Sequence, residues 1–212
     1  MSFILNLFNY LLSYIYSITG DLGISIIILT LSVRILLLPI SIKQKINMVK
    51  QQDISQKLQE LKTRCKNNNK KLELESAKLY KESSKNMLGC FVSLIQLPIM
   101  WALYNIIIKI PMNVGTIVIP WVANIKFSDK YYIIPIIYML VSLSPSLLSY
   151  IKILNGFSKD NNKVSMIIVG LFSTLITIKA PVALGIYFIT TGICSFFEEV
   201  GFRIYMKNRC FN

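Results

Sequence analysis

Residues 22–42 read LGISIIILTLSVRILLLPISI, and this run carries the strongest structural signal in the chain. It is 21 residues long, and a helix needs about 20 apolar residues to cross the hydrocarbon core of a bilayer. Its single charged residue, Arg34, lies near the middle. The run therefore predicts a membrane-spanning helix that carries one cation.

The rest of the chain repeats this apolar character. Of its 212 residues, 54% are hydrophobic and only 16% are charged, whereas about a quarter of the residues in a soluble domain are charged. Four further apolar runs follow, at 88–108, 131–151, 164–178 and 180–197. We therefore predict an all-α polytopic membrane protein with five transmembrane helices, whose ends lie on opposite sides of the membrane.

The orientation follows from the distribution of positive charge. Residues 43–85 contain twelve Lys or Arg and five Asp or Glu, a net charge of +7 within a chain whose net charge is +13. Because loops rich in Lys and Arg stay in the cytoplasm, we expect this segment there, with the N-terminus outside and the C-terminus inside. The predicted segments are an amphipathic helix at the outer interface (1–20), spans at 21–42, 87–109, 131–152, 164–179 and 180–203, a cytoplasmic helical hairpin (43–86), an outer loop (110–130), a cytoplasmic turn (153–163) and a cytoplasmic tail (204–212).

Residues 2–19 carry no charge and alternate apolar and weakly polar faces. We favour a helix that lies on the outer membrane surface, while a sixth span stays open as the alternative. Residues 43–85 place apolar side chains at helical spacing on both sides of Asn67-Asn68-Asn69. This pattern predicts two antiparallel helices with an Asn-rich tip, anchored only at the base.

Arg34 is the first candidate functional residue. A charge in the middle of a span costs about 2.5–3.5 kcal/mol, so it commonly marks a polar cavity. Eight residues separate it from Ile42, a rise of about 12 Å, which is long for a side chain that reaches for the headgroups. We favour the cavity over an Arg34 side chain that extends to the headgroups, and over an ion pair of Arg34 with Glu198 or Glu199.

Other polar residues lie in the predicted spans and are weaker evidence individually, because hydroxyls in membrane helices commonly bond their own backbone. We expect them to line one hydrophilic groove with Arg34, and we expect the two glutamates to lower its positive potential. The candidates are Thr30, Gln96, Tyr187, Thr190, Thr191, Ser195, Glu198 and Glu199.

Five stretches together resemble the YidC family of membrane protein insertases, in the same order from Gly20 to the tail. They are LTLSVRILLLPISIKQ at 29–44, LYKE at 79–82, LIQLPI at 94–99 with ALY at 102–104, YYIIP at 131–135, and PVALGIYF at 181–188. The resemblance implies that Arg34 projects into a groove open to cytoplasm and lipid, and that Thr30, Gln96 and Phe188 face the groove or the substrate. It also implies that the 43–86 hairpin is mobile.

The chain departs from the family pattern in two places. Residues 86–93 read NMLGCFVS, one residue shorter than the family pattern and without its two prolines. Gly192 stands where the family usually has Asn, and Glu198-Glu199 where it has a Gln pair. The absence of a large outer domain resembles the short form found in bacteria with a single membrane.

The expected function is insertion of hydrophobic segments and short polar tails of nascent proteins into the bilayer, without a chemical step, nucleotide, metal or other cofactor. The chain has no His, which argues against most hydrolase triads and zinc sites, and Cys65, Cys90, Cys194 and Cys210 lack the spacing of a metal site or disulfide framework. Beside nascent membrane proteins and lipid, the ribosome, the signal recognition particle receptor and the Sec translocon are candidate partners, and DNA is not. A secondary transporter or channel for an anionic solute is the alternative, although no internal repeat supports it.

Overall fold

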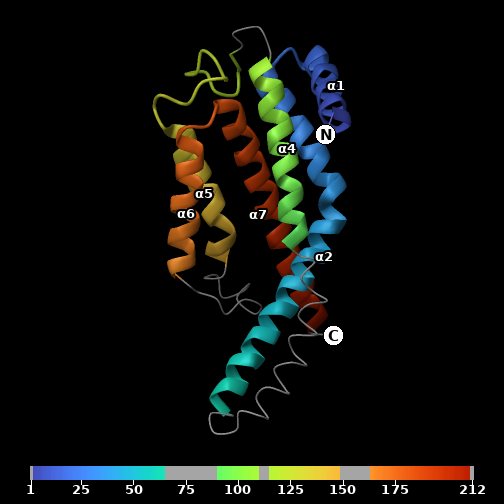
Figure 1. The fold of residues 1–212 in the computed structure, drawn as a ribbon, viewed down its shortest axis with the longest axis vertical. Coiled ribbons are helices and arrows are strands. Elements are labelled where there is room, and N and C mark those ends of the chain that lie inside the picture. Colours follow the sequence, from blue (N-terminus) through green and yellow to red (C-terminus); the bar gives the residue numbers. More distant parts are fainter. Residues whose placement is uncertain (1, 65–89, 110–114, 149–162, 211–212) are drawn as a thin grey trace. The chain divides into compact units, whose positions relative to one another are not determined.

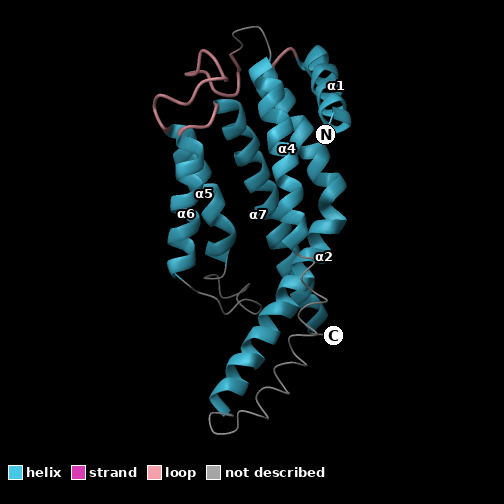
Figure 2. Cartoon of the chain, viewed as in Figure 1, coloured by secondary structure: helices cyan, strands magenta, loops and turns pink. Residues whose placement is uncertain are grey.

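The structure is a computed structural model that describes residues 2–64, 90–109, 115–148 and 163–210. All regular structure in these ranges is α-helical (Figures 1 and 2), which confirms the all-α prediction. By length and composition, two described helices could cross a membrane, Leu22–Leu58 and Val182–Asn208, and three shorter ones are also apolar. The helices are α1 (Ser2–Thr19), α2 (Leu22–Arg64), α4 (Cys90–Lys109), α5 (Ile133–Leu147), α6 (Lys163–Ile178) and α7 (Val182–Cys210).

The described residues divide into two units. The first contains residues 1–38 and 97–212, and the second contains residues 39–96. Helix α2 contributes to both, with Pro39 inside the helix at the boundary. Of the predicted hairpin, only the first arm as far as Arg64 is described, because the Asn-rich tip and the second arm lie outside the described residues.

The buried core of the first unit gathers where α2 and α7 begin. Ile26 of α2, Ile107 of α4, Ile125 of the connecting loop and Val182 of α7 are each at most 1% exposed. They belong to one apolar cluster that also includes Leu12 of α1. This end of the unit is therefore held by close packing of residues from four helices and a loop.

A loop spanning residues 115–132, drawn in pink in Figure 2, joins the ends of these helices. Asp21, just before α2, accepts hydrogen bonds from the Thr116 hydroxyl at 2.7 Å and from the backbone N–H of Ile117 at 2.7 Å. It also accepts one from the N–H of Ile24 at 2.9 Å, which caps the first turn of α2. Gly23 allows this approach, because a Cβ there would collide with the Thr116 side chain.

The same loop caps two more helices. Asp129 is buried and accepts hydrogen bonds from the backbone N–H groups of Tyr131 and Ile134 at the start of α5. The first N–H groups of α7 donate to loop carbonyls, Val182 to Phe127 at 2.9 Å and Ala183 to Ile125 at 3.0 Å. The four N–H groups that begin a helix have no partner within it, so these bonds stabilise the helix ends.

Helix α5 packs against both α6 and α7. Two glycines of α7 lie seven residues apart and face two α5 side chains with the same spacing: a Cβ on Gly185 would collide with Ile134, and one on Gly192 would lie 2.6 Å from Val141. Small residues let membrane helices approach closely. The absence of a side chain at these two positions therefore lets α7 approach α5 closely.

Helix α1 has one face against the core and one face exposed. Leu12 is 2% exposed and Phe8 and Ile15 pack beside it, whereas Tyr10 is 72% and Tyr14 59% exposed. The buried positions follow the spacing of an amphipathic helix. Helix α1 therefore packs against the rest of the first unit along one stripe and leaves its aromatic side chains exposed on the other face.

Two helices are longer than the predicted spans. Helix α2 continues without a break into the predicted hairpin, and α7 continues through the predicted tail to Cys210. Neither extension contains a glycine-rich or proline-rich stop signal, and Pro39 in α2 is accommodated inside the helix. Hydropathy marks where the apolar run ends, while the helix itself continues into the charged residues.

Candidate functional site

Arg34 lies on α2 beyond the buried core. Every residue from Leu31 to Leu38 is partly or fully exposed, and the same holds for every residue of α7 from Thr191 to Gly201. Upstream, by contrast, Val182 to Tyr187 are all buried. The first unit therefore has a closed end at the loop and a more open region along the later part of α2 and α7.

An ion pair joins the two helices in this open region. The Nη1 atom of Arg34 lies 3.7 Å from Oε1 of Glu198, and the two side chains are 20% and 10% exposed. Both helices begin at the loop. At 1.5 Å per residue, Arg34 lies about 18 Å from the start of α2 and Glu198 about 24 Å from the start of α7. The two charges therefore reach similar depths from opposite helices.

Arg34 thus forms the ion pair that we had weighed as the alternative to a cavity, and the cavity itself stays a prediction. The reason is electrostatic: a guanidinium that lies largely away from solvent is stabilised by a carboxylate at similar depth. At 3.7 Å the pair is longer than the 2.7–2.9 Å of a charge-assisted hydrogen bond. Arg34 is thus partly exposed and held by a loose contact.

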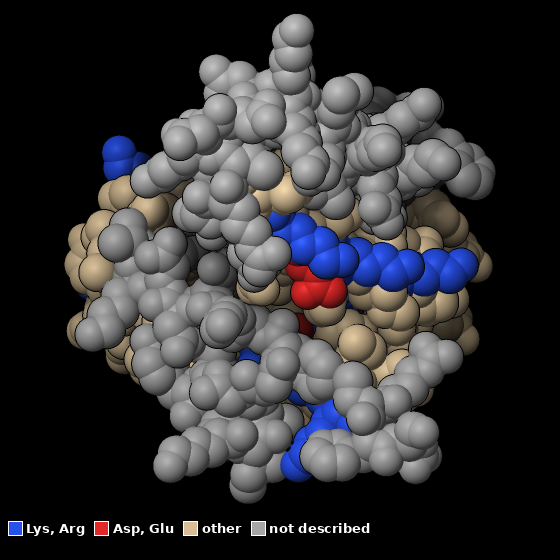
Figure 3. All heavy atoms as spheres, turned by 90° about the horizontal axis from the view of Figure 1, so that it is seen from below, with Lys and Arg blue, Asp and Glu red and all other residues tan. Residues whose placement is uncertain are grey.

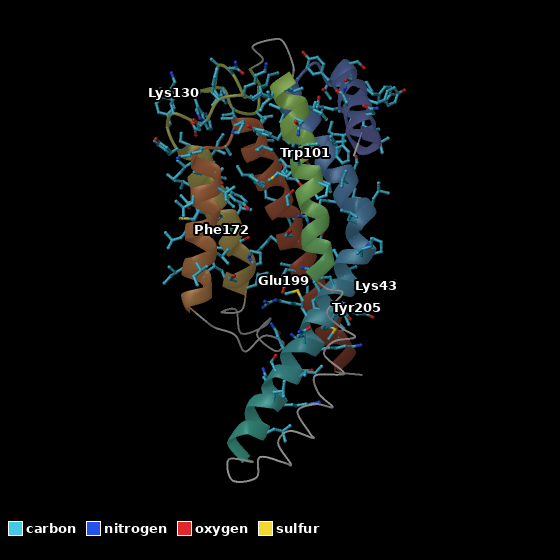
Figure 4. The ribbon with its side chains drawn as sticks, viewed as in Figure 1. Lys43, Trp101, Lys130, Phe172, Glu199 and Tyr205 are labelled. Carbon is cyan, nitrogen blue, oxygen red and sulfur yellow. The ribbon has the colours of Figure 1, made fainter. Side chains whose placement is uncertain are left out.

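Glu199 has a different partner from its neighbour. Its Oε1 accepts a hydrogen bond at 2.8 Å from Nε of Arg203, one turn further along α7, and the Arg203 side chain is 7% exposed. Adjacent residues on a helix point about 100° apart, which explains why the two glutamates separate. Figure 4 shows Glu199 in the later part of α7, with Tyr205 further toward the C-terminus.

The face of α7 that presents Glu198 also carries Thr191 and Ser195. The Ser195 hydroxyl donates to the Thr191 carbonyl at 2.9 Å. The Thr191 hydroxyl is buried and has no hydrogen-bond partner among the described residues. Cys194, a free thiol, lies on the same face and within electrostatic range of Arg34 and Glu198. Two residues of the predicted polar stripe, Thr191 and Ser195, thus share a face of α7 with Glu198.

The remaining candidates have other surroundings. The Thr30 hydroxyl is buried and donates to the Ile26 carbonyl at 2.6 Å. Tyr187 belongs to the buried core, and Phe188 stacks on Tyr138 of α5 with ring centroids 5.1 Å apart. Gln96 lies on α4, but its side chain is outside the described part of the structure.

Sequence reasoning missed Asp21 and Asp129, the two buried carboxylates of the closed end. A signal was present for both, because each is an Asp shortly before an apolar helical run, the usual position of a helix cap. It also missed the partner of Arg203, which the i,i+4 spacing from Glu199 could have indicated.

Comparison with known proteins gives a consistent result. Residues 14–209 match the family described as 60Kd inner membrane protein. The chain is 33% identical over 93% of its length to the membrane protein insertase YidC of Caldanaerobacter subterraneus subsp. tengcongensis, and covers 91% of that protein. It is 27% identical to the protein of the same name from Fusobacterium nucleatum and covers 96% of it. A longer Helicobacter pylori relative, also a membrane protein insertase YidC, is 28% identical, and the chain covers 36% of it. The chain therefore belongs to the YidC family, the 60Kd inner membrane proteins.

Proposed function

We propose that this chain is a membrane protein insertase in which Arg34 receives acidic groups from the polar tails of its clients. The clients are nascent membrane proteins, and the protein acts in the cell membrane as a polytopic α-helical protein without enzymatic chemistry. The observation that supports the role of Arg34 is its position: a partly exposed cation in the open region of α2 and α7, held by one loose ion pair.

The proposed path is a hydrophilic groove along this region. Thr191, Ser195 and Glu198 would form its wall on α7, with Thr30 one turn above Arg34 on α2. We propose Tyr187 and Phe188 as further residues of the site, and Gln96 stays a prediction from the sequence. Of the two glutamates expected to modulate its charge, we propose that only Glu198 does so, because Glu199 pairs with Arg203. The Thr191 hydroxyl supports this arrangement, because a buried hydroxyl without a protein partner favours a water or a client polar group beside it.

The energetics need no nucleotide. A client carboxylate 4 Å from Arg34 gains about 4 kcal/mol at an effective dielectric constant of 20, which offsets part of the cost of moving a polar tail through the membrane. The hydrophobic segment then enters lipid with a gain of about 25 cal/mol per Å² of apolar surface. Exposed apolar side chains on α5 and α6, such as Phe172 at 65% (Figure 4), are suited to contact with lipid.

We propose that five spans cross the membrane, with the closed end outside and the open region toward the cytoplasm. The exposed tyrosines of α1 suit the outer membrane interface, where aromatic side chains concentrate. Seen from below, the described Lys and Arg side chains are more prominent than the acidic ones (Figure 3). This distribution supports a cytoplasmic position for the 43–86 hairpin and for the end of α7, where the ribosome, the signal recognition particle receptor or the Sec translocon would bind.

The test compares two clients that differ only in their translocated tail, one with Asp and one with Asn at the same position. Arg34→Ala should reduce insertion of the Asp client at least about tenfold, which corresponds to about 1.4 kcal/mol, and should spare the Asn client. Arg34→Lys should retain much of the activity because it keeps the charge. Lys179→Ala removes an exposed cation just before α7 and serves as the matched control. Equal loss for both clients would show that Arg34 has a structural role instead.

A further inference from the structure

The two ion pairs of α7 have different geometries, although their carboxylates are adjacent in sequence. Glu199 and Arg203 lie on one helix, one turn apart, and make a hydrogen bond of 2.8 Å. Glu198 and Arg34 come from different helices, and their closest charged atoms are 3.7 Å apart. The first pair therefore has the geometry of a strong local bond, whereas the second is too long for a charge-assisted hydrogen bond.

The looser pair involves the cation that the proposed function assigns to the client. Its carboxylate is the same chemical group as the side chain of an Asp or Glu in a client tail. No residue of α7 from Thr191 to Gly201 is buried, and all of them are described. The Glu198 side chain keeps an exposed fraction of 10%, and a change of rotamer would move its carboxylate away from Arg34.

We propose that Glu198 is a specificity-determining residue that occupies Arg34 until a client carboxylate displaces it. This inference rests on the proposed function of Arg34. An acidic tail replaces one carboxylate with another, so Arg34 keeps a counterion throughout the exchange. A neutral tail offers no such replacement and leaves the pair intact. Glu198 therefore lowers the apparent affinity for acidic tails by the fraction of time that it occupies the cation.

The experiment uses the full-length protein in vesicles and the same Asp and Asn clients. Its readout is the ratio of Asp-client to Asn-client insertion. Glu198→Gln should raise this ratio by about three- to tenfold, because the competing charge is removed while the side-chain size is kept. Glu199→Gln is the matched control: any loss of stability from its pair with Arg203 falls on both clients equally, so the ratio should stay as in the unmodified protein.

A second readout measures occupancy directly. Cys194 lies within electrostatic range of Arg34 and Glu198, so a disulfide that an added thiol oxidant forms between this thiol and a cysteine placed in the client tail reports a tail at the site. The other three cysteines are replaced by Ser in all proteins compared. Cross-linking of the Asp client should increase with Glu198→Gln and stay unchanged with Glu199→Gln.

The outcomes separate this inference from the proposed function. A ratio that does not rise with Glu198→Gln, or rises equally with Glu199→Gln, overturns the role of Glu198, while the Arg34 proposal stands if Arg34→Gln still lowers the ratio. If Arg34→Gln leaves the ratio unchanged, both proposals fail. Should Glu198→Gln not fold, Glu198→Asp serves instead: it keeps the charge on a shorter side chain, and an unchanged ratio in this variant would also overturn the proposal.

Discussion

The loop that closes one end of the first unit should depend on the buried carboxylate of Asp21. This side chain is 6% exposed and accepts hydrogen bonds from the Thr116 hydroxyl and from the N–H groups of Ile117 and Ile24. Asp21→Ala removes the carboxylate that accepts these bonds. We expect it to weaken the attachment of the loop to α2 and thereby to destabilise the whole closed end.

The magnitude follows from which donors are left without a partner. The Thr116 side chain is buried, so its hydroxyl loses its acceptor at about 1–3 kcal/mol. Ile117 is 81% exposed, so water can replace the partner of its N–H at little cost. With the lost cap on α2 at about 1 kcal/mol, Asp21→Ala should cost about 2–4 kcal/mol. For a chain of this size that lowers the melting temperature by about 4–16 °C.

The pH dependence gives a second check. Burial raises the pKa of Asp21, but hydrogen bonds from Ile117, Ile24, Thr116 and Gly23 outweigh it and hold the pKa below its usual value of 3.8. A carboxyl group with a lowered pKa in the folded state contributes stability that is fully present above its unfolded pKa. That stability is lost as the pH falls through the folded pKa. Asp21→Asn should remove this acid-sensitive part and leave a shallower loss of stability below about pH 4.

The assay is thermal melting in detergent at pH 7 and over an acid series. Asp53→Asn is the matched control, because Asp53 is an exposed aspartate of α2. It should melt like the unmodified protein at pH 7. If Asp21→Ala also melts unchanged at pH 7, the hydrogen bonds of the loop do not hold the closed end and the reasoning is wrong.

Three other predictions concern the α5–α7 contact, the cap of α5 and the predicted hairpin. Gly192→Leu should destabilise the α5–α7 contact by about 1–3 kcal/mol through overpacking against Val141. Gly201→Ala should leave stability unchanged, because nothing lies near the added Cβ. The melting temperatures of both variants are the measurement. Asp129→Ala should lower stability by about 0.5–2 kcal/mol through loss of the α5 cap, and equal melting of variant and parent would contradict it. Deletion of most of residues 46–82 with a short linker should reduce client insertion more than melting temperature, because the sequence predicts a hairpin attached only at its base, which would support few contacts of the spans. Collapse of melting with normal insertion by the folded fraction would refute that last prediction.

The all-helical membrane fold was predictable from the sequence because it depends on a property that is local to each segment. An apolar run of about 20 residues must satisfy its backbone hydrogen bonds within itself in lipid, and a helix does so whatever its neighbours are. Arg34 stood out for the same local reason: a charge inside such a run is costly and therefore conspicuous. The family resemblance, carried by the residues around Arg34, needed no tertiary contact either.

The partners of the charged and small residues depended on the tertiary structure, because each contact joins segments far apart in the chain. Hydropathy could not show that Arg34 pairs with Glu198 while Glu199 bonds Arg203, since that depends on how α7 is rotated toward α2. It could not show that Asp21 holds the loop at Thr116, or that Gly192 makes room for Val141 of α5. The composition of each helix determines that it forms, whereas side-chain packing between helices decides which face each one turns to its neighbours.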